Sequence, residues 1–127
     1  MIKTAENSII IATTAEGLIR KADYFRRSLY RAKESGVNIL IAAPVTKDSK
    51  AAAKKLAEYA EIKNTESVIG RFVIVDNKQV TFMLLNDEGV HSNYDSGVWV
   101  NTPFFANALT NMFNLTWDKL PKLRKID

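Results

Sequence analysis

The sequence predicts an α/β domain in which a mixed sheet of about five to seven strands is flanked by helices. Two apolar runs, over 8–12 and 37–43, are separated by a helical pattern over about 15–35, and this order is typical of a parallel βαβ unit. A strand over 71–75 is followed by a short turn and a second strand over 80–85, which predicts an antiparallel hairpin. Parallel and antiparallel pairs in one chain indicate a mixed sheet.

Length and composition predict one domain spanning 1–127 that folds without disulfides or metals. The chain has 127 residues and no cysteine, which excludes disulfides, thiol catalysis and cysteine-based zinc sites, and we expect a cytoplasmic location. Its apolar runs are far shorter than the roughly twenty residues of a membrane helix, so we expect no membrane contact. A net charge of +4 permits nucleic-acid contact without requiring it.

The first helix has clear signals at both ends. Thr13 or its neighbour Thr14 begins it, and Thr13 has the capping-box spacing to Glu16. Gly36 ends it, because glycine readily adopts the left-handed conformation that stops a helix. The apolar positions that recur at helical spacing are Leu18, Ala22, Phe25, Leu29 and Ala32. Pro44 closes the strand that follows.

The middle of the chain carries weaker signals. Thr46 or Asp48 begins a helix over about 48–60, whose narrow apolar stripe predicts a surface position. Residues 66–69 form a weak strand candidate before the strong one.

Turn and capping residues mark the predicted elements in the rest of the chain. Asn77 and Lys78 have the length of a tight hairpin turn, 86–97 is a polar loop, and 98–100 is a last short strand. Thr102 caps a final helix with proline at its first position. Its aromatic row is interpreted mainly as core, with some members at a subunit interface: Phe104, Phe105, Phe113 and Trp117.

The strand from Ile69 to Asp76 carries a motif frame. With His at 69 and Lys at 71 it would read H-x-K-x4-D, so this segment resembles the motif of the phospholipase D superfamily. In that superfamily the His attacks phosphorus, the Lys neutralises phosphate oxygens and the Asp supports the motif. Here the nucleophile position is Ile69, Arg71 keeps a cation, Asp76 keeps the acid, and Asn86 stands where the motif has Asn. The resemblance therefore implies a phospholipase D-like fold without covalent catalysis, and we expect no enzyme activity.

A closer resemblance covers nearly the whole chain. The βαβ opening, the strand 71–76 and the segment from Gly97 to Trp117 resemble the phospholipase D-like C-terminal domain of archaeal TrmB-type transcriptional regulators. The resemblance implies effector sensing and homodimer assembly, with DNA bound only through a winged-helix domain that this chain does not contain. Residues 1–7 look like the end of a helix, so we expect the chain to be cut from a longer one.

Several candidate sites remain open. Arg71 and Asp76 either begin a strand and a turn, with Asp76 accepting local backbone hydrogen bonds, or bind an anionic or polyol effector. Thr13 and Thr14 lie where open α/β sheets place ligands. Asn86 completes this candidate ligand set. We expect no cofactor and no metal site, because the acids of the polar loop, Asp87, Glu88 and Asp95, match no EF-hand spacing.

Two rival functions follow from the same residues. A divergent phosphodiesterase or nuclease would recruit Arg71, Asp76 and His91, although the simplest interpretation of His91 is a surface side chain. A stand-alone nucleic-acid-binding module would use the basic residues of the first helix, which are Arg20, Arg26, Arg27 and Arg31.

Overall fold

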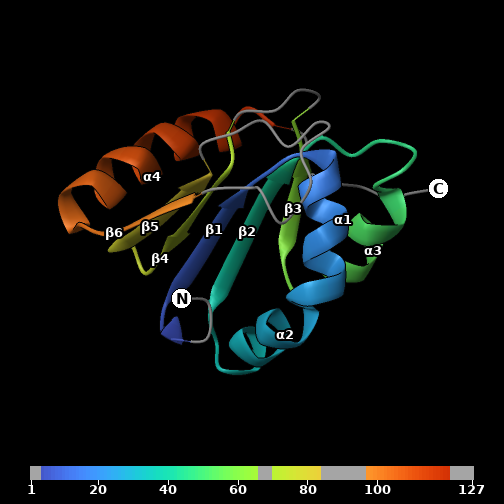
Figure 1. The fold of residues 1–127 in the computed structure, drawn as a ribbon, viewed down its shortest axis with the longest axis horizontal. Coiled ribbons are helices and arrows are strands. Elements are labelled where there is room, and N and C mark those ends of the chain that lie inside the picture. Colours follow the sequence, from blue (N-terminus) through green and yellow to red (C-terminus); the bar gives the residue numbers. More distant parts are fainter. Residues whose placement is uncertain (1–3, 66–69, 84–96, 121–127) are drawn as a thin grey trace.

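A six-stranded mixed sheet forms the centre of the protein, with strand order β3-β2-β1-β4-β5-β6 (Figure 1). The computed structural model describes residues 4–65, 70–83 and 97–120. The elements are β1 (Ser8–Ala12), α1 (Ala15–Tyr24), α2 (Arg26–Glu34), β2 (Asn38–Ala43), α3 (Lys50–Leu56), β3 (Glu61–Asn64), β4 (Phe72–Val75), β5 (Gln79–Met83), β6 (Gly97–Asn101) and α4 (Pro103–Trp117). The strand count and the mixed character confirm the predicted fold class.

Strand direction changes at β1. The strands β1, β2 and β3 are parallel, as the predicted βαβ unit requires, whereas β4 runs antiparallel to β1 and begins an antiparallel run through β5 and β6. Phe72 pairs with Ala12 and Val75 pairs with Ile9, so the start of β4 lies beside the end of β1.

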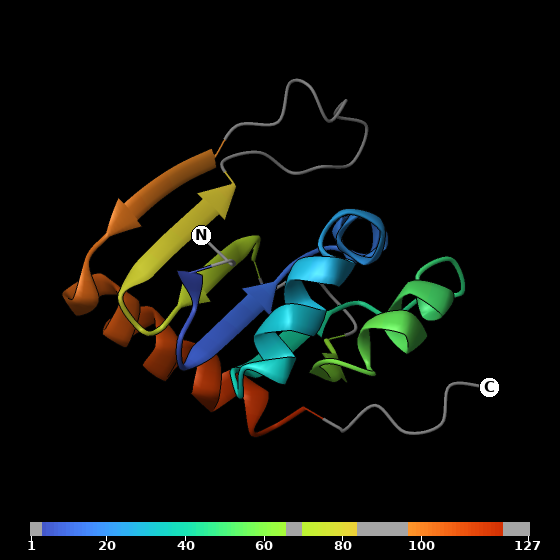
Figure 2. The same ribbon diagram turned by 90° about the horizontal axis from the view of Figure 1, so that it is seen from below.

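Helices cover both faces of the sheet, so β1 is buried on both sides (Figure 2). The side chains of Ile9 and Ile11 belong to the core beneath α1, α2 and α3, and Ile10 belongs to the core beneath α4. This is why β1 reads as a continuous apolar run instead of an alternating one.

The helix predicted over 15–35 is two helices. The chain breaks at Phe25, with φ −110° and ψ 1°, and α2 starts at the next residue. Phe25, one of the apolar positions that recur at helical spacing, is 40% exposed at this break. The cap is Thr14, whose Oγ1 accepts from the N–H of Gly17 at 2.8 Å, and Gly36 ends α2 with φ 85° as predicted.

The segment predicted as a helix over 48–60 is shorter. The helix α3 starts after Ser49 instead of at Thr46 or Asp48, and residues 61–64 form the strand β3, which the sequence pattern missed. Pairing with β2 supplies the burial that so short a strand lacks on its own.

The hairpin turn lies one residue earlier than predicted. Asp76 and Asn77 have positive φ, 54° and 58°, and Lys78 N–H donates to the carbonyl of Val75 at 3.0 Å. These angles are those of a type I′ turn, which suits the twist of the two strands. The next strand begins at Gln79 instead of residue 80 and is described as far as Met83, and its predicted end at 84–85 lies outside the described residues.

The end of the chain follows its predicted signals. Gly97–Asn101 forms the last strand, and Thr102 caps α4 through the N–H of Phe105 at 3.4 Å. Residues 4–7 are not α-helical. The expectations for residues 1–3, the strand at 66–69 and the polar loop with Asn86, Asp87, Glu88, His91 and Asp95 lie outside the described residues.

A buried lysine fixes the end of α4. Lys63 on β3 is only 7% exposed, its Nζ donates to the carbonyl of Trp117 at 2.8 Å, and it lies 4.6 Å from the Trp117 ring centroid. A cation at the carboxyl end of a helix is favoured by the helix dipole. This contact joins the end of α4 to β3, the outermost strand at one side of the sheet.

Candidate functional site

Three predicted site residues lie together at the edge of the sheet that is formed by the carboxyl ends of the parallel strands. Thr13 and Thr14 follow β1, and because Phe72 pairs with Ala12, the preceding Arg71 lies at the same edge. This is the end of the parallel strands, where open α/β sheets place ligands.

Thr13 and Thr14 form the buried part of this edge. Thr13 and Thr14 are buried, and Lys21 Nζ donates to Thr13 Oγ1 at 3.5 Å while Thr14 caps α1. A Cβ at Gly17 would overlap Thr13 Oγ1, so glycine allows α1 to start this close to the sheet. Lys21, Arg71 and the amino end of α1 contribute positive charge to this edge, and Glu16 in the first turn of α1 contributes a negative charge.

Asp76 lies at the opposite edge and holds the start of β1. Its carboxylate accepts from the backbone N–H groups of Glu6 at 2.9 Å, Asn7 at 2.7 Å and Ser8 at 3.0 Å. These donors lie about seventy positions away in the sequence, so the bonds are not the local ones expected of a turn aspartate. The backbone N–H of Asp76 also donates to the carbonyl of Ser8 at 2.9 Å.

The charge of Asp76 is stabilised in the fold. Burial would raise the pKa of its carboxyl, but the backbone hydrogen bonds from Ser8, Asn7 and Glu6, with the charge of Lys78, outweigh burial and hold the pKa below its ordinary value. The carboxylate is therefore ionised at neutral pH.

The two charged residues of the motif therefore lie at opposite ends of β4. Arg71 precedes the strand and Asp76 follows it, so the structure does not bring them together. Asn86 and His91 lie outside the described residues. Within the described ranges, no three His, Asp or Glu side chains gather closely enough to hold a metal ion.

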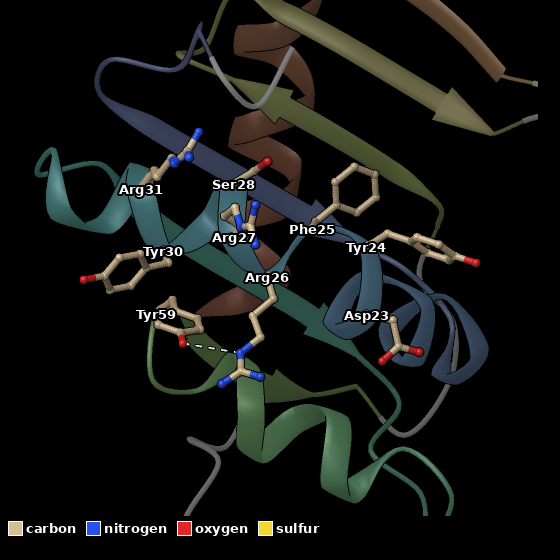
Figure 3. A pocket seen from close by; sticks show the side chains of 9 residues that line it. All are labelled: Asp23, Tyr24, Phe25, Arg26, Arg27, Ser28, Tyr30, Arg31 and Tyr59. Carbon is tan, nitrogen blue, oxygen red and sulfur yellow. Dashed lines mark hydrogen bonds between the residues drawn. The ribbon is translucent and has the colours of Figure 1, made fainter.

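A second candidate site lies at the break between α1 and α2. An open hollow of about 930 Å³ is lined there by Asp23, Tyr24, Phe25, Arg26, Arg27, Ser28, Tyr30, Arg31 and Tyr59 (Figure 3), which we call the α1–α2 surface. It contains three of the four arginines predicted for nucleic-acid contact. Arg20 lies on α1 outside this lining.

Tyr59 joins this surface from the turn after α3. Arg26 Nε donates to its Oη at 3.5 Å, and its ring meets the ring of Tyr30 edge-on with centroids 5.6 Å apart. The hydrogen bond to Tyr59 raises the pKa of Arg26, which is charged at any working pH. The sequence pattern did not single out the aromatic members of this surface as a site, although Tyr24, Phe25 and Tyr30 lie close to arginines in the sequence.

The outer face of α4 is a third unusual surface. The helix contains no charged residue, and its outer stripe, Phe104, Ala108, Met112 and Leu115, is exposed, with Phe104 85% and Leu115 70% accessible. Phe113 and Trp117 are core as predicted, whereas Phe104 and Phe105 are exposed. Among the described helices, none is long and apolar enough to cross a bilayer.

Residues 1–120 match the family described as transcriptional regulator TrmB, EBD N-terminal subdomain. The chain belongs to this family. The match confirms the TrmB-type resemblance inferred from the sequence. No curated protein matches the chain.

Solved structures share the fold. TrmBL2, an archaeal chromatin protein with a novel mode of DNA binding, has a TM-score of 0.71 at 21% identity over 96% of this chain. The chain covers only 47% of TrmBL2. Nuc of Salmonella typhimurium, a phospholipase D family member, has a TM-score of 0.70 at 19% identity, covering 98% of this chain and 86% of Nuc.

NucT of Helicobacter pylori gives the same result, with a TM-score of 0.70 at 15% identity over 96% of this chain and 86% of NucT. At such identities the similarity shows the fold alone, and the phospholipase D-like fold of this TrmB-family chain is confirmed.

Replacing Asp76 by Asn tests its role in holding β1. Asn tolerates positive φ, so Asp76→Asn mainly removes the charge and should lower the free energy of unfolding at pH 7 by about 1–2 kcal/mol. Because the folded-state pKa is lowered, the wild-type advantage should be complete above the unfolded pKa of about 4 and lost as the pH falls through the folded value.

Denaturant unfolding at a series of pH values measures this advantage. Asp48→Asn, in the exposed loop before α3, is the matched control and should unfold like the wild type at each pH. An advantage over Asp76→Asn that stays constant from pH 7 to acid would show that the carboxylate does not hold the strand.

Proposed function

We propose that the chain is a non-catalytic, effector-sensing and dimerising module of a TrmB-type transcriptional regulator. The family match supports the regulatory role. The observation that carries the non-catalytic part is the loss of the nucleophile of the motif. Ile69, at the nucleophile position, has no group that could attack phosphorus.

The DNA-binding role belongs to a larger assembly in this proposal. TrmBL2 is described as a DNA-binding chromatin protein, and this chain spans 47% of its length. We infer that operator DNA is bound by a winged-helix domain joined to this module, in the cytoplasm. The module would bias the spacing of two such domains.

The effector would bind at the edge formed by Thr13, Thr14 and Arg71. Lys21, Arg71 and the amino end of α1 favour an anionic ligand or a polyol that carries an anionic group. A ligand changes the arrangement of a dimer only if it binds one arrangement better than the other. The edge is built on α1, which could transmit such a preference to its neighbours.

Inorganic phosphate is the simplest probe of this edge. The free energy of unfolding of the wild type should increase by about 1.4 kcal/mol for each tenfold rise in phosphate above its dissociation constant. Arg71→Gln should lose this specific increase, whereas Lys47→Gln, in the exposed loop after β2, should keep it.

Thermal unfolding measured across a phosphate series separates binding from salting effects. Phosphate also stabilises proteins through exclusion from their surface, and that contribution is common to all three proteins. Equal stabilisation of the wild type and Arg71→Gln would therefore contradict an anion site at this edge.

The outer stripe of α4 supports self-association. In a two-fold symmetric antiparallel contact, Phe104 of one copy meets Leu115 of the other, because the stripe is apolar at both ends. The small Ala108 near the middle permits close approach of the two helices. An exposed apolar stripe on a helix without charge is otherwise unfavourable in water.

Sedimentation or light scattering tests this dimer. We expect a particle of twice 14.3 kDa for the wild type and a 14.3 kDa monomer for Phe104→Glu. The introduced charge is exposed at the start of α4, so it should not disturb the fold. Ala51→Glu, on the exposed side of α3, is the matched control and should remain dimeric. A monomeric wild type, or a dimer insensitive to Phe104→Glu, would contradict this interface.

A further inference from the structure

Three aromatic side chains are exposed around the break at Phe25. Tyr24 is 77% accessible, Tyr30 48% and Phe25 40%. Three large rings in seven consecutive residues, all on the surface, are unusual in a soluble domain unless they contact a partner.

Arginines are interspersed with these rings. Arg26, Arg27 and Arg31 are exposed, and nearby acids are Asp23 in the lining, Glu58 close to Arg26, and Glu34 three residues after Arg31 on α2. The amino end of α2 lies within the same surface and has no acidic residue in its first turn. The carboxyl end of α1 lies at the same break, so the two helix dipoles oppose each other there and the positive potential comes from the guanidinium groups.

Contacts with Tyr59 position two members of this surface, and Tyr30 stays 48% exposed. Arg26 and Tyr30 are both held against Tyr59, whereas Arg27, Arg31 and Tyr24 extend from the two helices. In the view of Figure 3, Arg26 and Arg27 lie between the rings of Tyr30 and Tyr59 and those of Tyr24 and Phe25. Cationic and aromatic groups are thus interspersed on this surface.

We propose that the α1–α2 surface binds single-stranded nucleic acid, with Arg27 and Arg31 on phosphates and Tyr24 and Tyr30 stacked on bases. A backbone of phosphates with unpaired bases offers anions and flat rings in alternation, which matches this surface on both counts. A duplex keeps its bases stacked inside, so it would leave the rings in water. An acidic peptide would pair with the arginines but offer nothing to the rings. This site is additional to the effector edge and to the α4 stripe.

Fluorescence anisotropy of the full 127-residue chain tests the proposal. The probes are a labelled oligo-dT of about 12 nucleotides, a duplex of equal length and a labelled poly-glutamate peptide. We expect oligo-dT to bind more tightly than either of the others, with log affinity falling linearly in log salt. No binding of oligo-dT at low salt would overturn the proposal, as would equal or tighter binding of the duplex or the peptide.

Two kinds of variant separate the phosphate and base contacts. Arg27→Gln/Arg31→Gln should reduce the magnitude of the salt slope by about 1.4, because each single-strand phosphate contact contributes about 0.7. Tyr24→Ala should weaken binding by roughly fivefold or more with the slope unchanged. Tyr24 is too exposed to be needed for folding, and circular dichroism verifies each variant.

A charge-matched control completes the test. Lys47→Gln/Lys119→Gln removes the same charge from the loop after β2 and the turn after α4, and should leave the slope unchanged. If this control reduces the slope as much as the arginine variant, binding is a non-specific effect of net charge and the proposal fails. It fails equally if Tyr24→Ala binds like the wild type.

Discussion

The carboxylate of Asp76 joins the start of the central strand to the end of its antiparallel neighbour. It accepts hydrogen bonds from Glu6, Asn7 and Ser8, and the carbonyl of Asn7 in turn accepts from the N–H of Asn38 at the start of β2. The starts of β1 and β2 and the end of β4 are thereby fixed at one edge of the sheet. Because β1 is buried on both faces, a shift in its register would disturb both cores at once.

The hydrogen bonds of Asp76 occupy that edge of the sheet, and three other surfaces carry the groups that we propose for function. The opposite edge carries Lys21 and Arg71, the outer side of α4 is apolar and uncharged, and the α1–α2 surface is basic and aromatic. A fold shared with phospholipase D family members therefore supports, in our account, ligand binding, self-association and nucleic-acid contact at separate places.

Local signals predicted the parts of this structure that depend on local chemistry. The βαβ order, the glycine stop at Gly36 and the Thr102 cap all follow from residues within a few positions. The break at Phe25 was missed because no Gly or Pro marks it and the apolar spacing continues through it. The strand β3 was missed because a buried lysine interrupts it, and the partner of that lysine, the Trp117 carbonyl, lies 54 positions away in the sequence. The partners of Asp76, likewise, lie too far along the chain for a local pattern to reveal.

The central claim is that this TrmB-family chain keeps the phospholipase D-like fold without its chemistry. The most direct test is release of nitrophenolate from bis(4-nitrophenyl) phosphate, without added metal, by the wild type and by Arg71→Ala. We expect no release above the buffer rate for either protein, because Ile69 provides no nucleophile. Metal-independent turnover by the wild type that disappears in Arg71→Ala would contradict the account and make the chain a phosphodiesterase.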